Sequence, residues 1–222
     1  MALKLFHCHE ARSMRSLWLI NELELEVEVV TLAFGRAMRS DDYLAQHPLG
    51  RVPCLVDGDL TLFESGAINE YLCEEYGSSS QLWRPPGHPE RAHWLQWMHY
   101  AETMTVHAAS LTQQAIAIAD PTLRSATVQK LETRRLQKAV EVIEKSLHDQ
   151  QYLLVSGFSA ADVAVGYSLH VARLFTDISV YPKVSEYYQR LASRAAFKAS
   201  LPAADAENRI YTQANYWLEN TG

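Results

Sequence analysis

The order of strand and helix signals in the first 78 residues most constrains what this chain can fold into. Each signal rests on local periodicity, on a helix cap or on a turn dipeptide, and Asp57-Gly58 joins two apolar runs as a hairpin. The expected elements are strand 3–7, helix 12–25, strand 27–33, helix 40–48, two strands within 53–63, and helix 64–77. One βαβ unit followed by a hairpin predicts a mixed sheet with helices on its faces.

A different pattern follows. Ser, Pro and Gly gather near residues 79–88, which predicts a linker, and the rest of the chain is helical. The expected helices are 89–119, 122–150, 159–175, 182–194 and further helical material from residue 195. The segment 159–175 is apolar on nearly every face, so we expect it to be buried. The prediction is an α/β domain at 1–78, ordered β-α-β-α-β-β-α, a linker at 79–88 and an all-α domain at 89–222.

Charge and composition exclude several classes of function. The formal net charge is −6; residues 1–78 carry 6 Lys+Arg and 13 Asp+Glu, giving −7, and the remainder carries 14 and 13, giving +1. An acidic amino-terminal half argues against nucleic acid as a partner. No apolar run approaches the roughly 18 residues of a membrane span, and we expect no signal peptide. Three cysteines without a CxxC pair favour the reducing cytoplasm.

Three stretches of sequence carry a family resemblance. "HPLGRVPCLVDGDLTLFESGAI" at 47–68 is similar to the glutathione S-transferase pattern NPxGxVPxLxDGxxxLxES-AI. "WMHYAE" at 97–102 resembles the first long helix of the second domain in bacterial members, and "GFSAADV" at 157–163 resembles the buried capping motif of that domain. The resemblance implies a cytosolic, bacterial-type glutathione S-transferase with a thioredoxin-like first domain, a helical second domain and a homodimeric assembly.

The same resemblance implies a set of glutathione-binding residues. A cis Val52–Pro53 bond would present the Val52 backbone to the cysteinyl amide of glutathione, as a short strand would; an ordinary trans proline at a strand start is the alternative. Glu64 and Ser65 lie where a strand gives way to a helix, whose first N–H groups can receive the γ-glutamyl carboxylate. Glu64 would then pair with the α-ammonium, unless it only favours the helix start. Arg51 either pairs with a glutathione carboxylate or is solvated.

The group that activates the thiol is harder to assign. The thiolate is the nucleophile, and a free thiol with a pKa of about 8.5 is mostly protonated at neutral pH. Within "HCHEARSMRS" at 7–16, gapless matching puts Ala11 where several classes of the family place a serine. We therefore predict Ser13 as the hydroxyl donor, with Arg12 as an alternative and backbone N–H groups alone as a third. Ser13 could instead be only a helix N-cap.

Other candidates receive structural interpretations. Cys8 closely follows a buried strand and is expected to be structural, and His9 matches roughly where cysteine-type members place their cysteine, so no redox role is expected. His47, where the family often has Asn, is expected to cap its turn. Ser159 and Asp162 have capping-box spacing, Phe158 stands at the position of a hydrophobic staple, and the motif is a folding feature.

The helical domain would form the pocket for the second substrate. Trp97, Tyr100 and Met104 recur at near-helical spacing, so some of them face the core, and His99 is a candidate contact to glutathione or substrate. His99 and His107 are too far apart for a helical metal site, where i and i+4 are usual, and no metal is expected.

Together these features predict a glutathione transferase that uses glutathione as co-substrate and conjugates it to a small electrophile. The alternatives are a weakly active or non-catalytic binding protein on the same fold, or a glutathione-dependent isomerase, dehalogenase, peroxidase or disulfide reductase, because a fold does not determine function.

Overall fold

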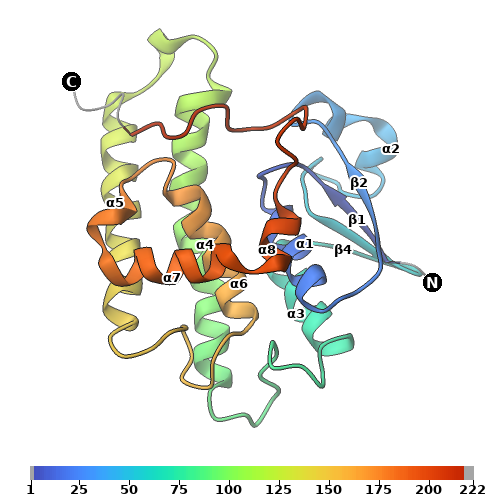
Figure 1. Cartoon of the computed structure of the whole chain (residues 1–222). Helices are drawn as coiled ribbons and strands as arrows, with labels where there is room; N and C mark the ends of the chain where they lie inside the picture. Colours follow the sequence, from blue (N-terminus) through green and yellow to red (C-terminus); the bar gives the residue numbers. More distant parts are fainter. Residues whose placement is uncertain (1–2, 218–222) are drawn as a thin grey trace. The chain divides into compact units, whose positions relative to one another are not determined.

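The chain forms two compact units. The computed structural model describes residues 3–217. Within them, the first unit takes the chain up to His88 and again from Ala192 to Thr212, and the second takes Pro89–Leu191 and the chain from Gln213 onward. The elements of the first unit up to His88 are β1 Leu3–His7, α1 Ser13–Glu22, β2 Val27–Thr31, η1 Arg36–Arg39, α2 Asp41–Leu44, β3 Cys54–Asp57, β4 Leu60–Phe63 and α3 Ser65–Glu75 (Figure 1).

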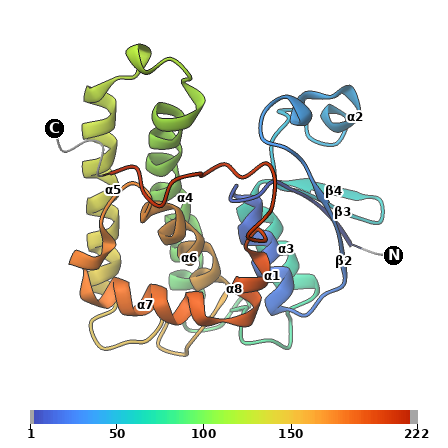
Figure 2. The same cartoon turned by 45° about the horizontal axis from the view of Figure 1, so that its top comes forward.

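The four strands make one mixed sheet in the order β2-β1-β3-β4. β1 is parallel to β2 and antiparallel to β3, and β3 and β4 form the predicted hairpin, with Asp57 opposite Leu60. α1 contacts both β1 and α3, and the two helices lie on one face of the sheet (Figure 2). The predicted β-α-β-α-β-β-α order and thioredoxin-like class are confirmed.

The second unit is helical, as predicted. Its elements are α4 Arg91–Thr112, η2 Gln113–Ala117, η3 Pro121–Leu123, α5 Ala126–Ser146, α6 Ala160–Ala172, η4 Ile178–Val180 and α7 Pro182–Ser193, whose last two residues fall in the first unit. All of α6 is buried, because the helix is apolar on every face. The predicted helix 89–119 is shorter: α4 ends at Thr112 and continues as a π-helical turn.

The Asp162 carboxylate stabilises the start of α6 through hydrogen bonds. The capping box with Ser159 is present, and the fully buried Asp162 carboxylate also accepts hydrogen bonds from the Leu153 N–H, at 3.0 Å, and from the Tyr187 hydroxyl, at 2.8 Å. The predicted capping box is therefore present, and the carboxylate joins three separate segments of the unit.

Two segments are placed differently from the predicted boundaries. Residues 79–88, predicted as a linker, belong to the first unit, where the buried Arg84 donates to the Trp83 carbonyl at 3.0 Å. Residues 192–212, assigned by the sequence to the helical domain, also return to the first unit.

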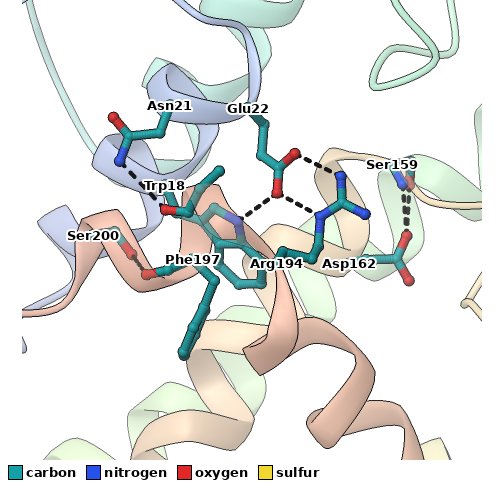
Figure 3. A network of polar contacts seen from close by, with 9 residues as sticks. Trp18, Asn21, Glu22, Ser159, Asp162, Arg194, Phe197 and Ser200 are labelled. Atoms are coloured by element: carbon teal, nitrogen blue, oxygen red, sulfur yellow. Dashed lines mark hydrogen bonds and ion pairs between the residues drawn. The ribbon is translucent and has the colours of Figure 1, made fainter.

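Contacts between residues that are far apart in the sequence explain why residues 192–212 belong to the first unit. α8, Ala195–Ser200, contacts α1, and the Phe197 ring lies 4.8 Å from the buried Trp18 ring. The Glu22 carboxylate accepts from Arg194 Nε and Nη2 at 2.6 and 2.7 Å and from Trp18 Nε1 at 2.8 Å (Figure 3).

Candidate functional site

The turn before β3 has the backbone geometry that the family pattern implies. The Val52–Pro53 peptide is cis, as predicted. The Tyr43 hydroxyl donates to the Arg51 carbonyl at 2.5 Å, and Gly50 has φ 55°, where a Cβ atom would lie 2.3 Å from the Met38 carbonyl oxygen. Glycine is therefore required there, and the turn is fixed on both sides. The Arg51 side chain itself is exposed.

His47 caps this turn. Its Nδ1 accepts the Leu49 N–H at 3.2 Å, and its ring lies 4.8 Å from that of Phe63 at the end of β4. Burial lowers the pKa of His47, and the negative charge of Glu64 opposes that shift in part. A neutral imidazole keeps the lone pair that the cap needs, so the interpretation of His47 as a turn cap fits this geometry.

Glu64 and Ser65 begin α3 as the sequence suggested. Glu64 is exposed and has φ 75°, so the chain turns sharply from β4 into the helix. Ser65 is buried, and its Oγ accepts from Arg15 Nη1 at 3.2 Å. A carboxylate at this helix start would meet N–H groups, a hydroxyl and the field of a guanidinium beneath them.

Arg15 was missed by sequence reasoning. The residue lies on α1 and its side chain is almost completely buried. A charged residue within an amphipathic helix normally indicates the solvent face. The only available signal was its position one turn before Trp18 on the apolar face of the helix.

The geometry does not fit the predicted role of Ser13 as thiol donor. Ser13 is fully buried; its Oγ accepts the Cys8 N–H at 3.1 Å and also lies 3.2 Å from the Cys8 carbonyl oxygen and 2.9 Å from His7 Nδ1. A hydroxyl has one hydrogen to donate, and this one is engaged inside the fold. Ser13 therefore connects the end of β1 to the start of α1.

The groups around Ser13 are neutral at physiological pH. Burial, and then the neighbouring His9, lower the pKa of His7 to about 4. Burial, and then the charge of Glu10, raise the pKa of the Cys8 thiol to about 11. A buried protonated thiol is a poor nucleophile, which agrees with the structural interpretation of Cys8.

Ala11 and Arg12 lie on the loop that precedes α1. The Ala11 N–H donates to the Cys8 carbonyl at 3.1 Å, and Arg12 is the N-cap residue of α1, where its side chain makes no capping hydrogen bond. Both side chains are half-buried. Since the Ser13 hydroxyl is engaged elsewhere, Arg12 and the backbone N–H groups stay as the two other predicted candidates for the thiol activator.

The predicted contacts of the helical unit have mixed outcomes. His99 is exposed on α4 and belongs to a different unit from the other predicted residues, so its role stays a prediction. Tyr100 faces α5, because its hydroxyl donates to the Ala139 carbonyl at 3.0 Å, and Trp97 and Met104 are buried. The Tyr100 hydroxyl is therefore engaged in the contact between α4 and α5.

Residues 3–217 contain neither a candidate metal cluster nor a helix that could span a membrane. No cluster of three or more His, Cys, Asp or Glu side chains there has the arrangement of a metal site. No helix in that range is long and apolar enough to cross a membrane.

Comparisons with known proteins identify a family for both parts of the chain. Residues 1–74 match the family model "Glutathione S-transferase, N-terminal domain", and residues 113–201 match "Glutathione S-transferase, C-terminal domain". The dichloromethane dehalogenase of Methylophilus leisingeri is 30% identical over 211 residues, covering 87% of this chain and 78% of the relative.

Solved structures are similar over nearly the whole chain. BphK, a bacterial GST solved as a ternary complex, is 25% identical with a TM-score of 0.78, covering 89% of this chain and 97% of that one. The glutathione transferase URE2P8 from Phanerochaete chrysosporium, solved with oxidized glutathione, has a TM-score of 0.80 at 19% identity, covering 89% of this chain and 92% of that one. The second similarity supports the fold alone.

Proposed function

Because the chain belongs to the glutathione S-transferase family, we propose that it binds glutathione, favours its thiolate and conjugates it to a small electrophile. The observation that supports this proposal most directly is the start of α3. There the buried Ser65 accepts a hydrogen bond from the buried Arg15. The turn that contains the cis Val52–Pro53 bond lies beside this helix start. A zwitterionic tripeptide matches such a surface, because its carboxylate needs donors and its backbone needs a strand-like partner.

Each binding residue has a chemical role in this proposal. The Val52 backbone pairs with the cysteinyl amide, and Pro53 fixes its direction. Ser65 and the first N–H groups of α3 receive the γ-glutamyl carboxylate, and Glu64 pairs with the α-ammonium. Arg51 pairs with a carboxylate of the tripeptide, and His99 contacts glutathione or the second substrate.

The loop before α1 would stabilise the sulfur. Arg12, together with backbone N–H groups, favours the charged thiolate over the neutral thiol, and this lowers the pKa of bound glutathione. The second substrate meets side chains of the helical unit. Dehalogenation is a variant of the same displacement, since halide is then the leaving group, and one relative is named a dichloromethane dehalogenase.

Retention on glutathione-agarose followed by a chlorodinitrobenzene assay tests this proposal. Binding with turnover supports a transferase, and binding without turnover supports the alternative, a binding protein on the same fold. Failure to bind glutathione would contradict both. Isomerase and disulfide-reductase assays on the glutathione-bound protein separate the remaining reactions.

Substitutions at the α3 start test the binding residues directly. Glu64→Ala and Ser65→Ala should each weaken glutathione binding by about 1–3 kcal/mol, since each removes a hydrogen bond to a charged group. Isothermal titration calorimetry measures the change. Glu74→Ala, at an exposed position on the same helix, is the control and should bind normally. Unchanged affinity in both test variants would show that glutathione binds elsewhere.

We also propose a cytoplasmic homodimer, in which the first domain of one copy contacts the helices of the other. The acidic first domain and the slightly basic remainder are compatible with that arrangement. The described cysteines are all free and buried, which suits a reducing compartment. Sedimentation at micromolar concentration should give a species of twice the 25.1 kDa chain mass; a single-chain species alone would contradict the dimer.

A further inference from the structure

The loop between β1 and α1 is held by hydrogen bonds from the carboxyl-terminal part of the same unit. Glu10 lies in this loop and is 5% exposed. Its Oε1 accepts from Arg209 Nη2 at 2.7 Å and from Arg209 Nε at 3.2 Å, and its Oε2 accepts the Tyr211 N–H at 2.9 Å. Both carboxylate oxygens are therefore engaged by a segment that is distant in sequence but belongs to the same compact unit.

The backbone of Glu10 has an uncommon conformation, as expected for a residue that its surroundings hold in place. Glu10 has φ 63°, a left-handed conformation that is uncommon for residues other than Gly, Asn and Asp. Such a conformation persists where the surrounding contacts fix it, and here Arg209 and Tyr211 hold the side chain. On the other side of the loop, Ser13 fixes Cys8. The short loop is thus held at two points.

The residues held between these points are those that the proposed function needs. Ala11 and Arg12 directly follow Glu10, and they carry the backbone N–H groups and the guanidinium proposed to face the sulfur. A hydrogen bond or a charge stabilises a thiolate only if it is correctly placed, and small displacements reduce its effect strongly. The Glu10 conformation therefore determines where these groups lie.

We propose that Glu10 is a positioning residue: its carboxylate, held by Arg209 and the Tyr211 N–H, fixes the loop so that Ala11 and Arg12 stabilise the glutathione thiolate. Glu10 does not itself touch the sulfur. This inference rests on the proposed function, and it adds that residues 201–212, far from the glutathione-binding segments in sequence, tune the ionisation of the thiol.

The chain provides a matched control for a merely structural role. Arg194 belongs to the same returning segment, and it binds the largely buried carboxylate of Glu22 through two nitrogens, at 2.6 and 2.7 Å. Glu22 is the last residue of α1, at the opposite end of the helix from the loop, and Figure 3 shows its contact with Arg194. Loss of either ion pair loosens the segment, but only loss of the Arg209 pair releases Glu10.

The experiment compares Arg209→Ala with Arg194→Ala in the full chain. Ultraviolet titration measures the pKa of bound glutathione, and kcat and KM for chlorodinitrobenzene are measured across pH. Arg209→Ala should raise that pKa and lower kcat roughly tenfold on the acidic side of it, with recovery at higher pH. Glutathione affinity measured below that pKa, where the bound thiol is protonated, should be unchanged. Arg194→Ala should lower thermal stability and leave the titration curve unshifted. Arg209→Lys, which keeps the charge and one contact, should restore part of the wild-type profile.

Each outcome is decisive. If Arg209→Ala and wild type give superimposable titration curves and pH profiles, the positioning role of Glu10 is wrong while the proposed function stands. If both arginine variants shift the curve equally, the segment acts only through general stability, and the inference is also wrong. If wild type fails to bind glutathione, the proposed function fails and this inference fails with it. Should Arg209→Ala not fold, Glu10→Gln provides the same comparison, because it removes the charge and retains an acceptor for Tyr211.

Discussion

Replacing Asp162 with alanine is expected to lower the free energy of unfolding of the helical unit by about 3–5 kcal/mol. The carboxylate is fully buried and accepts from the Ser159 N–H and hydroxyl, at 2.8 and 3.1 Å, besides the Leu153 N–H and the Tyr187 hydroxyl. An alanine leaves these buried donors without their acceptor, and a single donor that cannot reach water or another acceptor costs about 1–3 kcal/mol. Urea unfolding measures the loss.

Two variants separate this effect from ordinary capping. Asp177→Ala removes a half-buried aspartate that accepts the Ser179 N–H at 2.9 Å and the Ser179 hydroxyl at 2.6 Å, and should cost only about 1 kcal/mol. Asp162→Asn keeps one acceptor oxygen and should fall between the two. An Asp162→Ala protein of wild-type stability but without activity would mean that Asp162 acts in binding or catalysis instead.

The sequence predicted the elements well because each carries its own local signal. Asp57-Gly58 specifies a hairpin turn between two apolar runs, and the structure pairs Asp57 with Leu60 across it. The spacing of Ser159 and Asp162 predicted a capping box for the same reason. The additional partners of Asp162 could not be predicted, because Leu153 and Tyr187 reach it only through the tertiary fold.

The return of residues 192–212 to the first unit was missed for a related reason. A helical signal from residue 195 states that a helix forms, and it does not state what the helix packs against. The contacts that decide this, Phe197 on Trp18 and Arg209 on Glu10, join residues nearly the whole chain apart. No periodicity or turn signal reports on such pairs.

The candidate site likewise has parts that local sequence signals predict and parts that only the tertiary fold determines. The Val52–Pro53 turn and the Glu64-Ser65 helix start follow from a short, specific pattern, and the structure has both. Whether Ser13 can act as the thiol activator depends on which way its hydroxyl points. The sequence shows Ser13 near a helix start, but only the fold brings Cys8 and His7 to its oxygen.

Introducing a hydroxyl at residue 11 should accelerate conjugation at neutral pH by roughly 10- to 1000-fold, by analogy with the effect of one oxyanion donor. Ala11 matches the position where several classes of the family place a serine, and its carbonyl accepts the Met14 N–H at 2.9 Å, so it is held at the entry to α1. In Ala11→Ser, the new hydroxyl would donate to the sulfur. That hydrogen bond favours the charged form, so the pKa of bound glutathione should fall. Ultraviolet titration of the thiolate band and kcat/KM for chlorodinitrobenzene measure the two effects.

Ser13→Ala is the matched comparison, because it removes a hydroxyl two residues away that the fold already uses. It should leave the thiolate titration unshifted and lower the free energy of unfolding by about 1–3 kcal/mol, since the buried Cys8 N–H loses its acceptor. Arg12→Ala completes the set: if the guanidinium stabilises the sulfur in the wild type, this variant raises the thiol pKa. A silent Ala11→Ser together with a shifted Ser13→Ala curve would reverse the assignment, and would mean that the Ser13 hydroxyl leaves Cys8 and His7 when glutathione binds.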